Sequence, residues 1–314
     1  MNHLKNNNNK INSMLSKIKN ELLGAREADY YFAPFFRFFI GFFCFLHFLS
    51  ITTDFQLLYG KNGFVPSEVG ELFKGFGILG FSQFSSFSAS VFGFDEAASV
   101  LLFKILFLFF SLSFTFGFLT RFSAFVLLII QITLAKGSYL YTYGVDNFTT
   151  IALFYCVIFP LNRQLSIDSK IFRLKPVSIS KYRKVLQLHL CFVYFFSGFE
   201  KALGVNWWNG ESIWKCLTMP ILGNHAYDFS FLASLPVLPT LLGWSILLIE
   251  LGYPFFIFRK STSKYWLAMV VSMHIGILFF LNLYFFSALM IILNVSAFLD
   301  LSKQQSIKAK TSLI

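Results

Sequence analysis

Long apolar segments, each close to the length of a membrane-crossing helix, recur along the whole chain. Crossing ~30 Å of hydrocarbon takes about 20 consecutive apolar residues in an α-helix. Only helices and closed barrels span a bilayer, because no water is present there to satisfy free backbone groups. The eight candidate segments are residues 34–53, 97–119, 122–138, 146–161, 185–203, 238–258, 264–281 and 283–300. They predict an all-α fold, a polytopic membrane helix bundle with about eight transmembrane helices.

The low charge content agrees with a membrane protein. Only 13% of the 314 residues are charged, whereas about 25% is usual in a soluble domain. This argues against soluble nucleotide-binding and DNA-binding folds. The four cysteines have no C-x-x-C spacing and the five histidines no H-x-x-x-H spacing, so the sequence predicts neither a disulfide framework nor a metal site.

The distribution of lysine and arginine predicts the orientation of the helices. With the N-terminus inside, 19 of the 26 basic residues fall on inner segments and only 4 on outer segments, while Arg37, Lys104 and Lys201 lie in or beside helices. Cytoplasmic loops of membrane proteins carry such an excess. We therefore predict that both termini are cytoplasmic, in a bacterial inner membrane. The net charge of +11 then reflects the orientation of the chain in the lipid bilayer and not a nucleic-acid partner.

The chain divides into a central membrane domain and two tails. Residues 1–30 form a cytoplasmic tail, residues 31–300 the transmembrane domain, and residues 301–314 a second cytoplasmic tail. Apolar residues recur at helical spacing between Ile11 and Leu22, which favours an amphipathic helix on the membrane surface. A weakly ordered tail fits the polar composition equally well.

The connections between the apolar segments differ in length. Arg121 is the only charged residue between the second and third segments, and Leu281 and Asn282 mark a turn between the last two, so each pair is predicted to form a tight antiparallel hairpin. Two outer loops are longer. We expect residues 54–96 to form short helices or re-entrant turns at the interface, and residues 204–237, which are rich in tryptophan, to contribute to an aromatic belt.

A few charged residues fall at membrane depth, where a charge costs about 2.5–3.5 kcal/mol on insertion scales. Arg37 is near a helix end, and we expect its long side chain to reach the interface. Glu250 is in the middle of the sixth segment, so it needs a partner or a proton. Lys201 and His274 are its candidate partners.

Lys201 also ends a helix face of small and polar residues. Tyr194, Ser197, Gly198 and Lys201 follow i, i+3, i+4, i+7 spacing and share one side of the fifth helix. A lysine in a desolvated groove can act as a base. Alternatively, the same polar residues form a buried ion-pair network that holds the helices in register.

Several short motifs occur in a defined order along residues 34–300. They are F-R-F-F-I-G at 36–41, G-F-L-T-R-F-S at 117–123, S-Y-L-Y at 138–141, Y-F-F-S-G-F-E-K at 194–201, W-W-N-G at 207–210, L-L-I-E at 247–250, and His274 ahead of F-F-S at 285–287. In order and spacing they resemble the HTTM (horizontally transferred transmembrane) domain family, which includes the membrane domain of vitamin K-dependent gamma-carboxylase.

The resemblance implies an outward-facing site that uses a reduced quinone, either menaquinone or a vitamin K-like molecule. Lys201 matches the family lysine held to deprotonate the reduced vitamin, and Glu250 and His274 would shape its surroundings; these three are the candidate catalytic residues. Five residues of the matched motifs are the candidate cofactor-binding residues: Tyr139, Tyr194, Ser197, Trp207 and Trp208.

Two positions depart from the carboxylase pattern. Gly137 stands in place of a histidine and Glu200 in place of a second lysine. The large lumenal portion of the carboxylases has no counterpart after Ile314, so we do not expect protein glutamate carboxylation. The alternative function is a non-catalytic scaffold, maturation or immunity factor in which the buried polar residues are structural. A transporter is less favoured, because the sequence has no inverted repeat. The sequence does not identify a protein partner.

Overall fold

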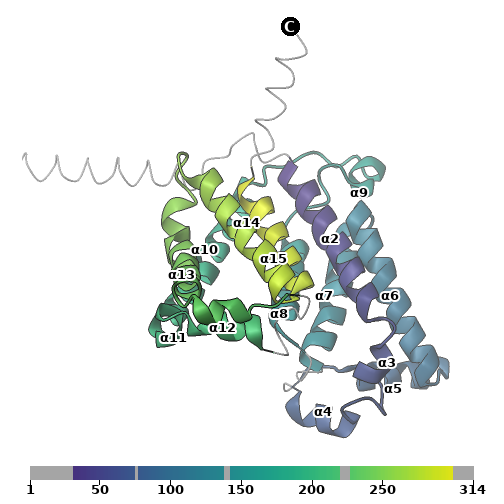
Figure 1. Cartoon of the computed structure of the whole chain (residues 1–314). Coiled ribbons are helices and arrows are strands. Elements are labelled where there is room, and N and C mark those ends of the chain that lie inside the picture. The colour runs from purple at the N-terminus through teal and green to yellow at the C-terminus, as the bar shows by residue number, and fades with distance from the viewer. Residues whose placement is uncertain (1–30, 75–76, 138–141, 220–226, 300–314) are drawn as a thin grey trace, which may run out of the picture.

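The computed structural model describes residues 31–74, 77–137, 142–219 and 227–299, which are helical and contain no strand (Figure 1). The prediction of an all-α fold is therefore confirmed. Three features predicted from the sequence lie outside the described residues: the amphipathic helix of the N-terminal tail, Tyr139, and the tail of residues 301–314.

A helix occupies each of the eight predicted apolar segments. Their bounds are α2 (Phe32–Ile51), α6 (Glu96–Phe116), α7 (Thr120–Gly137), α8 (Gly144–Ile158), α10 (Ser180–Leu203), α13 (Val237–Phe256), α14 (Ser263–Phe280) and α15 (Tyr284–Phe298). Within the described ranges, α2, α6, α13 and α14 are long and apolar enough to cross a membrane. By contrast, α8 and α15 have 15 residues each, or about 22 Å of helix. The count of eight spans stays a prediction.

Apolar side chains cover part of the outside of the bundle. On α6, Leu101, Ile105 and Phe109 form a stripe in which each residue is at least 53% exposed. Water-soluble monomers rarely present such continuous apolar surface. Together with the four long apolar helices, this stripe is what a surface in contact with lipid requires.

Short helices lie at the two ends of the bundle. The first predicted outer loop contains α3 (Phe55–Tyr59), α4 (Ser67–Phe73) and α5 (Phe81–Phe92), so the short helices expected there are confirmed. The second contains α11 (Val205–Trp208), α12 (Glu211–Thr218) and the 3-10 helix η3 (Ser230–Ser234), whereas α9 (Ile167–Ile171) follows α8. Figure 1 shows α3 to α5 and α11 to α12 at one end of the bundle and α9 at the other.

Both predicted hairpins are confirmed, since α6 packs against α7 and α14 against α15. The first turn includes Gly117 at φ 75°, a conformation that glycine adopts without strain. The second includes Asn282 at φ 55°, and asparagine tolerates this left-handed region better than most residues. Asp168 then fixes the start of α7 by accepting hydrogen bonds from the backbone N–H groups of Leu119 and Thr120, both at 2.8 Å.

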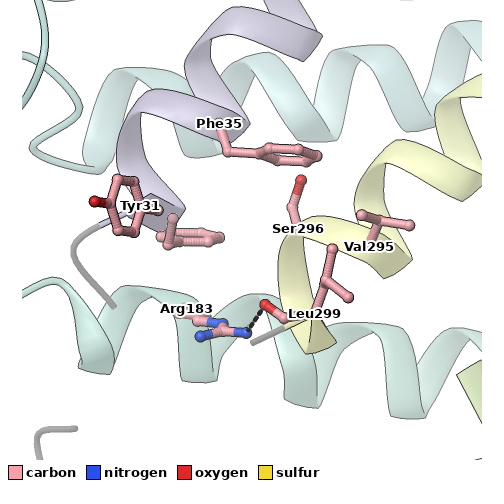
Figure 2. A pocket seen from close by; sticks show the side chains of 7 residues that line it. Tyr31, Phe35, Arg183, Val295, Ser296 and Leu299 are labelled. Atoms are coloured by element: carbon pink, nitrogen blue, oxygen red, sulfur yellow. Dashed lines mark hydrogen bonds between the residues drawn. The ribbon is translucent and has the colours of Figure 1, made fainter. Parts of the chain in front are cut away.

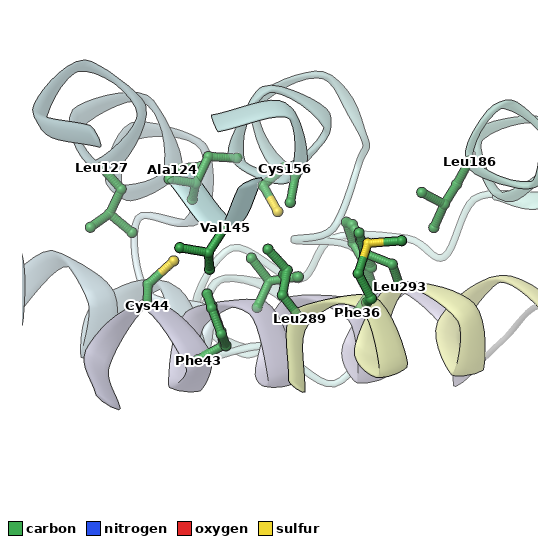
Figure 3. Close-up of a cluster of buried hydrophobic side chains, with 14 of the residues drawn as sticks. Phe36, Phe43, Cys44, Ala124, Leu127, Val145, Cys156, Leu186, Leu289 and Leu293 are labelled. Carbon is green, nitrogen blue, oxygen red and sulfur yellow. The ribbon is translucent and has the colours of Figure 1, made fainter. Parts of the chain in front are cut away.

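The core is aromatic and is shared by helices distant in sequence. Figure 3 shows side chains of α2, α7, α8, α10 and α15 meeting there, among them Phe36, Leu127 and Leu293. On α2, the ring of Phe48 stacks on Phe107 of α6 with 4.1 Å between centroids. Interlocked rings of this kind set the relative positions of the helices.

Arg37 does not reach the interface, so that expectation is wrong. The residue is only 3% exposed. Its guanidinium donates to the backbone carbonyls of Leu161 at 2.7 Å, Gln164 at 3.1 Å and Leu165 at 2.6 Å. The loop between α8 and α9 thus turns its carbonyl groups toward α2, and this supplies inside the protein the acceptors that a snorkelling arginine would find in water.

Candidate functional site

Lys201 and Glu250 form an ion pair between α10 and α13, two helices that pack against each other. The Lys201 Nζ atom is 2.8 Å from Oε2 of Glu250 and 3.0 Å from Oε1, and it also donates to the Ser197 hydroxyl. The predicted partnership of Lys201 with Glu250 is confirmed. An ammonium group has three donors, and here all three have acceptors.

Gly198 lets the two helices approach closely at this pair. A Cβ atom at Gly198 would lie 2.8 Å from the Cβ of Glu250 and 3.0 Å from the backbone N of Leu251. Both distances are well below normal van der Waals contact. The small-residue face predicted on α10 is therefore the surface that receives α13.

Gly198→Ala is expected to lower the free energy of unfolding by about 1–3 kcal/mol, because the added methyl group must push α13 away. Thermal unfolding of the purified protein in detergent would measure this. Gly276→Ala is the matched control, since the nearest atom to a Cβ there is 3.9 Å away on Phe280. Equal unfolding temperatures for the two variants would contradict the close helix contact.

The lysine of the ion pair is partly exposed, whereas the carboxylate is buried. The Lys201 side chain is 24% exposed and that of Glu250 only 7%. The indole ring of Trp207 lies beside the ammonium, with 5.4 Å between Nζ and the ring centroid, within cation–π range. A molecule approaching the pair therefore meets the lysine and Trp207 first.

His274 does not join this ion pair, which corrects the expectation that it is a partner of Glu250. Its Nε2 atom is 2.8 Å from the Tyr194 hydroxyl. Tyr194 precedes Lys201 by seven residues on the same face of α10, a distance of about 10 Å along the helix. The three candidate catalytic residues therefore divide into two groups, an ion pair and a neutral hydrogen-bond network.

The neutral network includes two residues that the sequence analysis missed. Asn294 of α15 donates from Nδ2 to the Tyr194 hydroxyl at 2.7 Å, and Tyr253 of α13 donates to Oδ1 of Asn294 at 2.6 Å. The rings of Tyr194 and Tyr253 also stack, with 4.3 Å between centroids. Two signals could have found them: Tyr253 follows Glu250 by three residues on one helix face, and Asn294 is an amide within an apolar helix.

The predicted cofactor-binding residues have different surroundings. Ser197 and Trp207 contact Lys201, and Tyr194 contacts His274. The Trp208 indole N–H donates to the carbonyl of Ala202 at 2.8 Å, and the Trp208 carbonyl accepts from Trp244 at 2.9 Å. Trp208 thus holds α11 against α10 and α13. In the ranges that the structure describes, no three metal-ligating side chains come together.

A shallow pocket lies at the other end of α10 (Figure 2). It is lined by Tyr31, Phe32, Phe35, Arg183, Val295, Ser296 and Leu299. The Arg183 guanidinium donates to the carbonyls of Ala297 at 2.9 Å and Leu299 at 2.8 Å, which satisfies the C-terminal end of α15. Arg183 and Lys201 are separated by about 27 Å of helix. This pocket is therefore not part of the site at Lys201.

Comparison of the chain with protein-family models, with curated proteins and with solved structures found no match. The function is therefore argued from the arrangement of Lys201, Glu250 and the network at His274.

Proposed function

We propose that this chain is an integral membrane protein of the bacterial inner membrane, with eight spans, both termini in the cytoplasm and an outward-facing acid–base site at Lys201. The site acts on a lipid-soluble, quinone-like molecule in its reduced form. The resemblance to the HTTM family supports the choice of substrate. The short helices α11 and α12, which carry the tryptophans of the predicted outer boundary, lie at the Lys201 end of α10 and support the orientation.

The observation that carries this proposal is a partly exposed ammonium in contact with an enclosed carboxylate. In a medium of low dielectric constant, an ion pair of ammonium and carboxylate is little more stable than the neutral pair that forms when the proton moves from the ammonium to the carboxylate. Transfer of a proton from Lys201 to Glu250 leaves a free amine and a carboxylic acid. The amine lone pair can then take the hydroxyl proton of a hydroquinone, giving the hydroquinone anion beside the lysine ammonium.

The test is turnover of reduced menaquinone with oxygen by the purified protein in nanodiscs. The resemblance predicts quinone epoxide as the product. Lys201→Met should lower the rate by about 10²–10⁴-fold, the usual contribution of a general base. No turnover by the unmodified protein, or equal turnover by Lys201→Met, would exclude the enzymatic function. Mass spectrometry of co-purified lipids would then identify the ligand class independently.

A second candidate is a non-catalytic scaffold, maturation or immunity factor in which the ion pair only locks α10 to α13. Two observations favour it: all three N–H donors of Lys201 have acceptors within the protein, and α13 lies close to α10 at Gly198. On this proposal Lys201→Met lowers the unfolding temperature and leaves any co-purified small molecule in place. A variant that keeps its stability but loses its ligand would contradict it.

Cys216 offers a test of the orientation. It lies on α12 and is partly exposed, whereas Cys44, Cys156 and Cys191 are buried. Partial burial raises the pKa of the Cys216 thiol, so less thiolate is present at neutral pH and the reaction with thiol reagents should accelerate as pH rises through the alkaline range. A membrane-impermeant thiosulfonate should label intact spheroplasts, and Cys216→Ser should abolish the label. Labelling only after permeabilisation would reverse the proposed orientation.

A further inference from the structure

Hydrogen bonds around Asn294 fix which atoms donate in the buried network. Nδ2 of Asn294 lies 2.8 Å from the carbonyl oxygen of Met290. A carbonyl oxygen only accepts, so the amide nitrogen must face it and the orientation of the amide is determined. The same nitrogen donates its second hydrogen to the Tyr194 hydroxyl.

The donor direction then passes from Tyr194 to His274. Because the Tyr194 oxygen already accepts from Asn294, its own hydrogen is free to point at Nε2 of His274, 2.8 Å away. Nε2 is then the acceptor nitrogen of a neutral imidazole, and the ring proton is on Nδ1. This tautomer is the arrangement in which each donor of Tyr253, Asn294 and Tyr194 has an acceptor.

The Nδ1–H of His274 is a buried donor with unused capacity. His274 is 3% exposed, and its Nδ1 atom has no hydrogen-bond partner among the residues that the structure describes. Buried donors are normally paired. Four helices thus hold one imidazole in one tautomer and orientation, with its N–H directed to a place where none of the described residues accepts it.

Further unpaired polar atoms lie on the helices that meet beside His274. The ring of Phe286 on α15 packs edge to face on His274, with 5.9 Å between centroids, and contacts Phe148 of α8 at 6.0 Å. The hydroxyl groups of Thr149 on α8 and Ser287 on α15 are buried and also lack a hydrogen-bond partner within the described part of the chain. Three of the buried side chains without a partner among the described residues are thus carried by α8, α14 and α15, the three helices that the contacts of Phe286 connect.

We propose that the Nδ1–H of His274 is the hydrogen-bond donor that holds an oxygen atom of the quinone-like ligand. The inference rests on the proposed function and assigns His274 a role separate from that of Lys201. Lys201 removes a proton, whereas His274 binds and orients the ring oxygen from the interior of the bundle. A neutral donor suits a carbonyl or phenolic oxygen, since the contact requires no charge to be desolvated. Phe286 must turn aside to admit the ligand, because its ring covers His274.

Two substitutions separate ligand binding from the structural role of the imidazole. In His274→Gln the side-chain oxygen can reach the former Nε2 position and accept from Tyr194, but no donor remains at the Nδ1 position. In His274→Asn the amide nitrogen takes the Nδ1 position, and the contact with Tyr194 is lost. Each variant therefore preserves one function of the ring.

The measurement uses full-length protein in nanodiscs with menadione as the probe and empty nanodiscs as the control for partitioning. His274→Gln should keep the unfolding temperature of the unmodified protein and bind menadione about tenfold more weakly. His274→Asn should unfold at a lower temperature and bind menadione within about threefold of the unmodified protein. The infrared carbonyl band of bound menadione should shift to lower frequency in the unmodified protein and in His274→Asn, but not in His274→Gln.

Three results would overturn the inference. They are unchanged affinity in His274→Gln, an unshifted carbonyl band in the unmodified protein, and no menadione binding at all. The last would mean that the ring of Phe286 or a water molecule satisfies the N–H. Turnover that depends on Lys201 but is accompanied by unchanged binding in His274→Gln would refute the role of His274 alone. If the unmodified protein neither turned over reduced menaquinone nor bound menadione, the proposed function would be refuted as well.

Discussion

Arg37→Met is expected to lower the free energy of unfolding by about 2–6 kcal/mol. The substitution removes the donor for the carbonyls of Leu161 and Gln164, which are buried, and of Leu165, which is partly buried, and each buried group left without a partner costs about 1–3 kcal/mol. The apolar methionine side chain fills much of the same volume, so the lost hydrogen bonds account for most of the effect. Thermal and denaturant-induced unfolding in detergent would measure it.

Two further variants identify the cause of this loss. Arg37→Lys keeps the charge but not the planar fork of donors, so it should recover only part of the stability. Lys170→Met removes an exposed positive charge from α9, the helix that follows this loop, and should change the stability by no more than about 0.5 kcal/mol. If Arg37→Lys were fully stable, the charge and not the hydrogen-bond geometry would be responsible.

The helices could be predicted from the sequence, because the length of an apolar segment and the places where it is interrupted are local properties. Residues 283–300, for example, predict α15 within a few residues. Arg37 shows where this reasoning fails. An arginine near a helix end can stay buried only if another part of the chain supplies acceptors for its guanidinium. For Arg37 these acceptors are carbonyls more than 120 residues away, in the loop before α9.

The candidate site could likewise be predicted only in part. Lys201 and Glu250 could be paired from sequence because a carboxylate at membrane depth needs a cation, and few cations are available. His274 has no such requirement, since a neutral imidazole carries no charge and can bond with many kinds of polar group. Its partner is Tyr194 because α15 packs against both α10 and α14 and brings these side chains together, and one sequence without known helix neighbours does not contain that information.

Single and double substitutions at the ion pair should differ sharply in stability. Lys201→Met leaves the Glu250 carboxylate, which is 7% exposed, without a partner, and loss of one member of a buried pair costs about 3–5 kcal/mol. Glu250→Leu should cost less, because the Lys201 side chain is 24% exposed and its flexible stem can carry the ammonium toward solvent.

The double variant Lys201→Met/Glu250→Leu removes both charges together and should be close to the unmodified protein in unfolding temperature, because apolar pairs often replace buried ion pairs at no net cost. Comparison of the four proteins in a double-mutant cycle gives the coupling free energy. We expect the double variant to regain stability but not quinone turnover. The contact between the helices needs only side chains that fit together, whereas proton transfer needs the lysine amine. If the double variant were as unstable as Lys201→Met alone, the two charges would not act as a pair, and neither the structural lock nor the acid–base site could depend on their contact.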